Sequence, residues 1–166
     1  MSDQRESPKP RSRFAAPEPG SLKARLAEQT RAALKAGERV RLGAFRMLSA
    51  AVTNREVELG HGLSDDEFVE VATREVKRRQ EAIEAFEKGG RPERAAQERE
   101  ERAALEDYLP PALSESEIEA LVDDAMAKTG ATGPSDFGKV MGLVMGQVKG
   151  RADGKVVQQK VRARLG

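Results

Sequence analysis

Cysteine and tryptophan are absent from this chain of 166 residues, and its only aromatic residues are five Phe and one Tyr. The lack of cysteine excludes disulfide scaffolds, thiol catalysis and cysteine-ligated zinc. In the most apolar segment the uncharged run Val140 to Val148 is far shorter than the ~20 residues that a membrane-spanning helix needs. No apolar leader follows the N-terminus. We therefore expect a cytoplasmic protein that does not associate with membranes.

Charged residues are plentiful instead and make up 34% of the chain, compared with ~25% in an average domain. Apolar residues make up 38%. With so few aromatics, a core must be built from Leu, Val, Ala and Met, which favours packed helices. No alternating strand pattern of useful length is present. The composition therefore predicts an all-α fold of one or two small domains.

Helical periodicity and breakers divide the chain into seven expected helices. Two consecutive prolines, Pro110 and Pro111, force extended backbone and mark the joint between two groups of helices. We expect the third and fourth helices to form a long antiparallel hairpin. The predicted organisation is a disordered tail at 1–20, a four-helix domain at 21–108, a hinge at 109–113 and a three-helix domain at 114–166.

Capping residues fix several expected helix ends. Ser21 precedes the first helix and Gly37 ends it, while Ser64 and Ser114 each begin a capping box with Glu three residues later. Asp153 is the expected cap of the last helix.

The helical spacing also assigns core positions. It places Leu34 and Met47 in the core. Arg46, next to Met47, is expected to be partly buried and paired with a carboxylate such as Glu75 or Glu58.

The formal net charge of +1 conceals an uneven distribution. Residues 21–60 hold eight basic and four acidic side chains, whereas residues 61–108 hold nine basic and fourteen acidic ones. Residues 134–166 hold seven basic residues against Asp136 and Asp153, a balance of +5. Two basic regions therefore flank an acidic middle, which directs attention to the C-terminal segment as a polyanion-binding region.

Glycine recurs at every fourth position of that segment, at Gly138, Gly142, Gly146, Gly150 and Gly154. The first three lie inside the expected sixth helix, which begins near Pro134, and each costs about 1 kcal/mol there relative to alanine. Their regular spacing exposes a strip of bare backbone beside the apolar stripe of the helix. Two interpretations stand roughly equal: the strip admits another helix at close range, or it admits a ligand.

A basic, glycine-rich connection follows, from Lys149 through Gly150 and Arg151 to Lys155. It leads to the N-terminus of the last helix, where free N–H groups and the helix dipole favour a phosphate. The spacing of a nucleotide P-loop is absent. A nucleic-acid backbone, which needs several dispersed contacts, fits better than a nucleotide.

From about Leu22 to the end, the chain resembles the YqeY family, which is similar to the tail domain of the GatB component of the tRNA-dependent amidotransferase. The motifs that carry this resemblance are Arg46-Met47-Leu48, Asn54-Arg55-Glu56-Val57-Glu58, Tyr108-Leu109-Pro110, Gly138-Lys139-Val140-Met141-Gly142 and Lys149-Gly150-Arg151-Ala152-Asp153-Gly154-Lys155. That tail grips tRNA, away from the kinase and amide-transfer chemistry. The resemblance therefore implies RNA binding, with tRNA as the expected RNA, through Lys139, Lys149, Gly150, Arg151 and Lys155, with Gly138, Gly142 and Gly146 permitting close approach.

No catalytic set, cofactor or metal site is expected. No nucleophile motif occurs, and the single histidine, His61, lies between two glycines, where we expect it to be exposed. The carboxylates of the fourth helix, Glu98 to Asp107, are expected to form a solvated face paired with neighbouring arginines. Two alternatives to RNA binding remain: an adaptor that docks a partner helix, and an accessory to glutamine-dependent amide transfer (carbon-nitrogen ligation) on charged tRNA.

Overall fold

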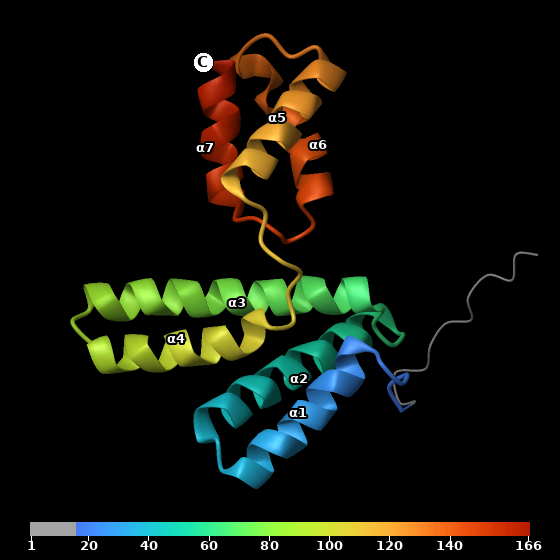
Figure 1. Cartoon of the computed structure of the whole chain (residues 1–166), viewed down its shortest axis with the longest axis vertical. Coiled ribbons are helices and arrows are strands. Elements are labelled where there is room, and N and C mark those ends of the chain that lie inside the picture. The colour runs from blue at the N-terminus through green and yellow to red at the C-terminus, as the bar shows by residue number, and fades with distance from the viewer. Residues whose placement is uncertain (1–15) are drawn as a thin grey trace, which may run out of the picture. The chain divides into compact units, whose positions relative to one another are not determined.

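A computed structural model describes residues 16–166, and this part of the chain is all-helical with no strand (Figure 1). Unit 1 ends at Tyr108 and unit 2 comprises residues 109–166. Unit 1 contains α1 (Leu22–Ala36), α2 (Arg39–Leu59), α3 (Asp65–Lys88) and α4 (Pro92–Glu106). Unit 2 contains α5 (Glu115–Thr129), the short 3-10 helix η1 (Pro134–Asp136), α6 (Phe137–Val148) and α7 (Gly154–Leu165). The predicted tail lies mostly outside the described residues.

Among residues 16–166, no helix combines the length and the apolar character that a bilayer span requires.

The helix ends follow from their capping residues. The Ser21 hydroxyl accepts a hydrogen bond from the Ala24 N–H, and Gly37 ends α1 in the left-handed conformation with φ 72°. Both predicted capping boxes are confirmed, at the starts of α3 and α5. Each satisfies two backbone N–H groups that the helix itself cannot pair.

Unit 1 consists of two helical hairpins, α1 with α2 and α3 with α4 (Figure 1). An aromatic cluster of Phe45, Phe68 and Tyr108 joins them, and the Phe45 and Tyr108 rings meet edge to face with centroids 6.0 Å apart. The predicted burial of Leu34 and Met47 is wrong, because these side chains are 58% and 49% exposed. Each lies at the edge of its helix's apolar stripe, where spacing alone does not decide whether a neighbour covers it.

A buried ion cluster stabilises the α3–α4 hairpin. Arg79 is 4% exposed, and its Nε lies 3.0 Å from a Glu101 carboxylate oxygen and 3.6 Å from one of Glu98. Its Nη1 lies 3.9 Å from Glu75. Burial, followed by repulsion from Glu101, raises the pKa of Glu98. The α4 carboxylates therefore do not all form the predicted solvated face, because Glu101 is buried and Glu98 is partly buried.

The expectation for Arg46 is also wrong. Arg46 is exposed, while Glu75 pairs with Arg78 and Arg79, and Glu58 pairs with Arg55.

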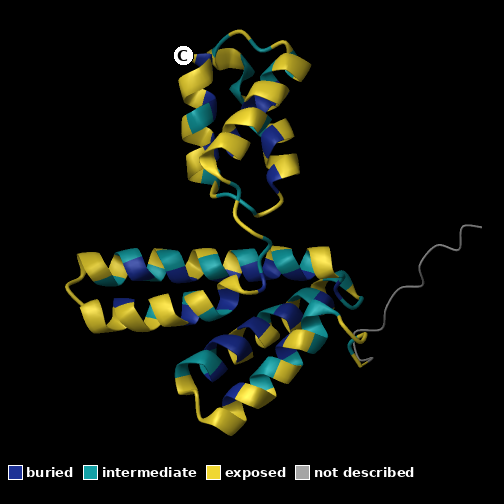
Figure 2. Cartoon of the chain, viewed as in Figure 1, coloured by how far each residue is buried: buried dark blue, intermediate teal, exposed yellow. Residues whose placement is uncertain are grey.

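Unit 2 has a small core built almost entirely from aliphatic side chains. Its buried members are Ile118, Val122, Ala125, Val140, Val144, Val148, Val157, Val161 and Leu165. They lie at three- and four-residue spacing on the inward faces of α5, α6 and α7, while exposed residues line the outward faces (Figure 2). This arrangement leaves the charges of unit 2 outside its core.

Candidate nucleic-acid interface

The three glycines of α6 lie on its solvent-exposed face, opposite the buried stripe of Val140, Val144 and Val148. A methyl group added at Gly138, Gly142 or Gly146 would meet no other part of the described chain within 4 Å. No helix within residues 16–166 therefore uses the close approach that the glycines permit. We call Gly138, Gly142 and Gly146, together with Lys139, Leu143 and Met145, the glycine face.

Apolar side chains of the glycine face are also unusually accessible. Leu143 and Met145 are each 39% exposed. Lys139 is on the same side of the helix, and its side chain is 73% exposed. The glycine face therefore combines bare backbone, accessible apolar groups and a positive charge.

The seven basic residues of 134–166 fall into two groups. Four of them have well-defined contacts within unit 2: Lys160 pairs with Glu115 and Glu119, Arg164 pairs with Asp123, Arg162 lies over the Phe137 ring, and Arg151 donates to the Pro111 carbonyl. The other three are the predicted site residues Lys139, Lys149 and Lys155. The structure thus separates cations that hold unit 2 together from three lysines on α6, at its C-terminal end and in the first turn of α7.

The most exposed of these cations have few competing partners. The side chains of Lys149 and Lys155 are exposed and form no hydrogen bond or ion pair with another residue of 16–166. Lys139 has one weak pair, with Nζ 3.7 Å from an oxygen of Asp136. The Thr132 N–H first, and Lys139 to a smaller extent, hold the pKa of Asp136 below its usual value. The three lysines can therefore accept an external anion with little loss of internal pairing.

Lys149 has an unusual backbone conformation. Within residues 16–166 it is the one non-glycine residue with positive φ, at φ 46° and ψ 48°. Gly150 follows with φ 75°. The left-handed region costs an L-residue about 1–2 kcal/mol, which glycine avoids. The backbone conformation at position 149 would therefore favour glycine, as at the next position, but the residue there is lysine.

The N-terminus of α7 is already capped from within the chain. The Asp153 carboxylate accepts a hydrogen bond from the Lys155 N–H at 2.8 Å. This hydrogen bond confirms Asp153 as the cap of α7. The Asp153 carboxylate therefore occupies the Lys155 N–H, one of the backbone groups that we expected to bind a phosphate. An anion bound there has to share the site with Asp153, so the lysine side chains are better placed than this helix end to provide contacts.

Arg151 is held by the joint segment. Its Nε donates to the Pro111 carbonyl at 2.9 Å, and its own carbonyl accepts from the Leu113 N–H at 2.7 Å. Its side chain is partly buried, unlike those of the three lysines. The structure therefore places Arg151 between Lys149 and Lys155 along the chain but gives it contacts within unit 2.

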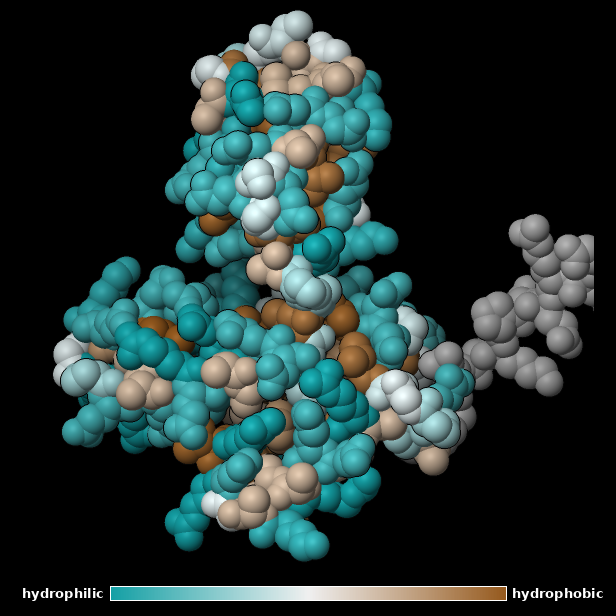
Figure 3. All heavy atoms as spheres, in the orientation of Figure 1, coloured by the Kyte–Doolittle hydropathy of each residue, from teal (hydrophilic) through white to brown (hydrophobic). Residues whose placement is uncertain are grey.

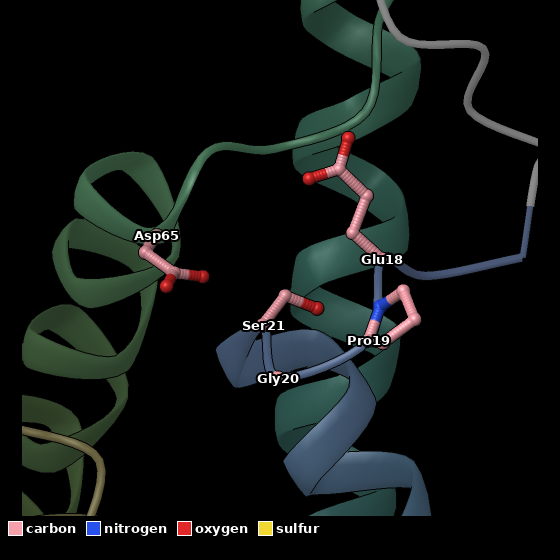
Figure 4. Close-up of a pocket in the computed structure, with 5 residues that line it drawn as sticks. All are labelled: Glu18, Pro19, Gly20, Ser21 and Asp65. Atoms are coloured by element: carbon pink, nitrogen blue, oxygen red, sulfur yellow. The ribbon is translucent and has the colours of Figure 1, made fainter.

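A hollow in unit 1 is unsuited to a polyanion. It has a volume of about 290 Å³ and is lined by Glu18, Pro19, Gly20, Ser21 and Asp65 (Figure 4). Asp65 accepts a hydrogen bond from the Leu22 N–H at 2.9 Å, which makes it part of the helix entry. Its charged lining is acidic, so we assign it no ligand.

Metal binding finds no support in the described chain. No group of three His, Asp or Glu side chains suitable for a metal ion occurs among residues 16–166. His61 is only partly exposed, with its Nδ1 2.9 Å from the Gly62 carbonyl oxygen and its Nε2 3.8 Å from Glu67. It therefore interacts with the start of α3.

Two features of this region escape sequence reasoning. The positive φ of Lys149 has no local signal, because lysine carries no preference for that conformation. The contact between Arg151 and Pro111 joins positions 40 residues apart, which periodicity does not detect. The view in Figure 3 shows a mostly hydrophilic surface with scattered hydrophobic groups, so overall hydropathy does not mark a site on that side either.

The sequence was compared with known proteins and with protein-family models. No curated protein matches the sequence. A family model described as "Yqey-like protein" matches residues 23–165, which include every helix of the structure except the first residue of α1. Because the match covers nearly the whole chain, the protein belongs to the YqeY family.

Proposed function

We propose that this protein is a noncatalytic RNA-binding module, with tRNA as its RNA, and that unit 2 makes the main contact. The observation that carries the proposal is Lys149, a lysine in a left-handed conformation that costs stability, exposed beside a glycine face that nothing in the described chain covers. Local strain retained at an exposed basic position is characteristic of functional sites.

The composition of the surface favours a phosphate backbone over a small anion. Lys139, Lys149 and Lys155 belong to α6, its C-terminal end and the first turn of α7, so their charges are spread along the surface. Dispersed lysines suit the sugar-phosphate backbone, which supplies many singly charged groups. We assign Gly150 to the same contact, because it continues the left-handed turn after Lys149.

The glycine face allows a ligand to approach the backbone of α6 closely. Without a Cβ at Gly138, Gly142 and Gly146, a ribose or phosphate can reach the helix backbone. Roughly 3 kcal/mol of helix propensity is lost at these positions, and the described chain shows no internal packing that uses the space. A bound partner would supply the missing contacts.

The two units would act as separate domains in this proposal. Unit 1, which has its own aromatic core, would be a lever or a second contact. The resemblance of the sequence motifs to the amidotransferase tail is our ground for naming tRNA as the ligand class. We do not extend the proposal to amide transfer, because the exposed side chains of Lys149 and Lys155 contact no base within residues 16–166 that would activate them as nucleophiles.

Titration with total tRNA at low salt tests the proposal. We expect saturable binding that weakens with salt, with a log–log slope of about −2 to −3 for three phosphate contacts. The double variant Lys149→Glu with Lys155→Glu should abolish binding. Lys128→Glu is the matched control, because Lys128 is an exposed lysine of unit 2 that pairs with Asp124 on α5. A lack of saturable binding by the wild-type protein would refute the proposal.

A protein-binding role is the second candidate, favoured by the accessible Leu143 and Met145 beside the glycines. In that case the glycine face would admit a partner helix. The two roles separate in a pull-down from cell extract, because a protein complex survives nuclease and high salt whereas an RNA complex does not.

A further inference from the structure

Arg151 connects two parts of unit 2 that are distant in sequence. Its side-chain Nε donates to the Pro111 carbonyl at 2.9 Å, and its carbonyl accepts from the Leu113 N–H at 2.7 Å. A third bond, from its own N–H to the Val148 carbonyl at 2.9 Å, fixes it to the end of α6. Arg151 therefore connects Pro111 and Leu113, the neighbours of Ala112, to the loop between α6 and α7.

The joint segment needs such an external partner. Pro110 and Pro111 have no N–H groups, and their rings exclude helical hydrogen bonding at this point. The Pro111 carbonyl and the Leu113 N–H are satisfied by Arg151. Leu113 then packs its partly buried side chain against the core of unit 2, as does Ala152 next to Arg151. The segment is thus ordered by the α6–α7 loop.

The charge of Arg151 is also directed toward this segment. Glu117, in the capping box that begins α5, has a pKa below its usual value. The Ser114 backbone N–H is the main cause, and Arg151 contributes a smaller electrostatic effect. The guanidinium group therefore interacts with the joint and the start of α5, whereas the side chains of Lys149 and Lys155 on either side of the loop remain exposed.

We infer that Arg151 is a positioning residue that anchors the Pro111–Leu113 segment to the loop between α6 and α7, rather than one of the phosphate contacts. The division of labour rests on the proposed RNA binding, but the anchoring does not. An RNA that binds only the ordered loop would stabilise the ordered joint, and the ordered joint would stabilise the bound state to the same extent.

Amide hydrogen exchange of Leu113 in the free protein tests the anchor. Arg151→Gln should speed this exchange about fivefold, the effect of losing one ordinary hydrogen bond. Arg151→Lys, which keeps the charge but lacks Nε, should do the same. Lys128→Gln is the control for loss of one charge and should leave it unchanged. The amides of Val144 and Val161 report on the core and should exchange as in wild type. Unchanged Leu113 exchange in both Arg151 variants would overturn the inference.

The salt dependence of tRNA binding tests the division of labour. Lys149→Gln and Lys155→Gln should each reduce the log–log salt slope by about 0.7 to 0.9, whereas Arg151→Gln should leave it unchanged. An equal loss of slope in Arg151→Gln would make Arg151 a phosphate contact and overturn the inference. If the wild-type protein binds no tRNA, the proposed function fails, and the Leu113 exchange in the free protein still decides whether Arg151 is an anchor.

Discussion

Among its described residues, from 16 to 108, unit 1 buries four charged side chains, Glu56, Glu75, Arg79 and Glu101, whereas the buried residues of unit 2 are all apolar. In unit 1, carboxylates gather around Arg79, and Lys23 holds Glu56 at 2.7 Å. In unit 2, charges stay outside a valine-rich core. The buried charges of unit 1 have partners inside the fold and therefore serve its stability. The exposed lysines and glycines of the α6 region make few contacts within the described chain, which favours a functional role for them.

The largest expected effect is a loss of unfolding free energy in unit 1 alone. Arg79→Ala leaves Glu75, Glu98 and Glu101 without their shared counter-ion, so unit 1 should lose about 3 to 5 kcal/mol of unfolding free energy. Hydrogen exchange under denaturant, resolved by residue, measures this loss at the Val71 amide. Arg78→Ala is the matched control, because the Arg78 side chain is 70% exposed and should contribute little. An equal loss at Val144 in unit 2 would contradict the independence of the two cores.

A smaller effect of opposite sign is expected at two helical glycines, one in each unit. Gly142→Ala should stabilise unit 2 by about 1 kcal/mol, because the added methyl meets no neighbour. Gly43→Ala in α2 meets the same open space and should stabilise unit 1 by about as much. Only Gly142→Ala should weaken tRNA binding. Equal tRNA affinity for both variants would remove the glycine face from the interface.

The aromatic cluster of unit 1 predicts a titration at high pH. Burial raises the pKa of Tyr108 to about 12, with Arg25 and Arg41 opposing the shift. Because the folded state favours the neutral phenol, this contribution to stability is complete below pH ~10, the pKa of an exposed tyrosine, and is lost as pH rises through 12. Near-ultraviolet absorbance follows Tyr108 directly, since the chain has one Tyr and no Trp. A midpoint near 10 in the folded protein would show that the ring is not enclosed.

Sequence patterns predicted the helices well because their ends have local causes. Ser21, Ser64, Ser114 and Asp153 each act on backbone within a few residues, so the chain alone specifies them. Burial at the edges of a helix stripe depends on neighbours, which explains the errors at Leu34 and Met47.

Long-range contacts explain the remaining differences. The choice of Arg79 over Arg46 as the buried cation depends on where α3 meets α4 and on the sulfur of Met47, to which Arg79 donates at 3.1 Å. For the candidate interface, the cations and glycines could be named from spacing. That the glycines face solvent, and that Arg151 contacts Pro111, required the structure.

Replacing Lys149 with glycine tests the central claim most directly, because fold and function make opposite demands at this position. Lys149→Gly should raise the unfolding free energy of unit 2 by about 0.5 to 1 kcal/mol, since glycine relieves the left-handed backbone at some entropic cost. The same variant should weaken tRNA binding several-fold, as should Lys149→Asn, which tolerates this backbone but lacks the charge. Greater stability with undiminished tRNA affinity would contradict the assignment of Lys149 to RNA binding.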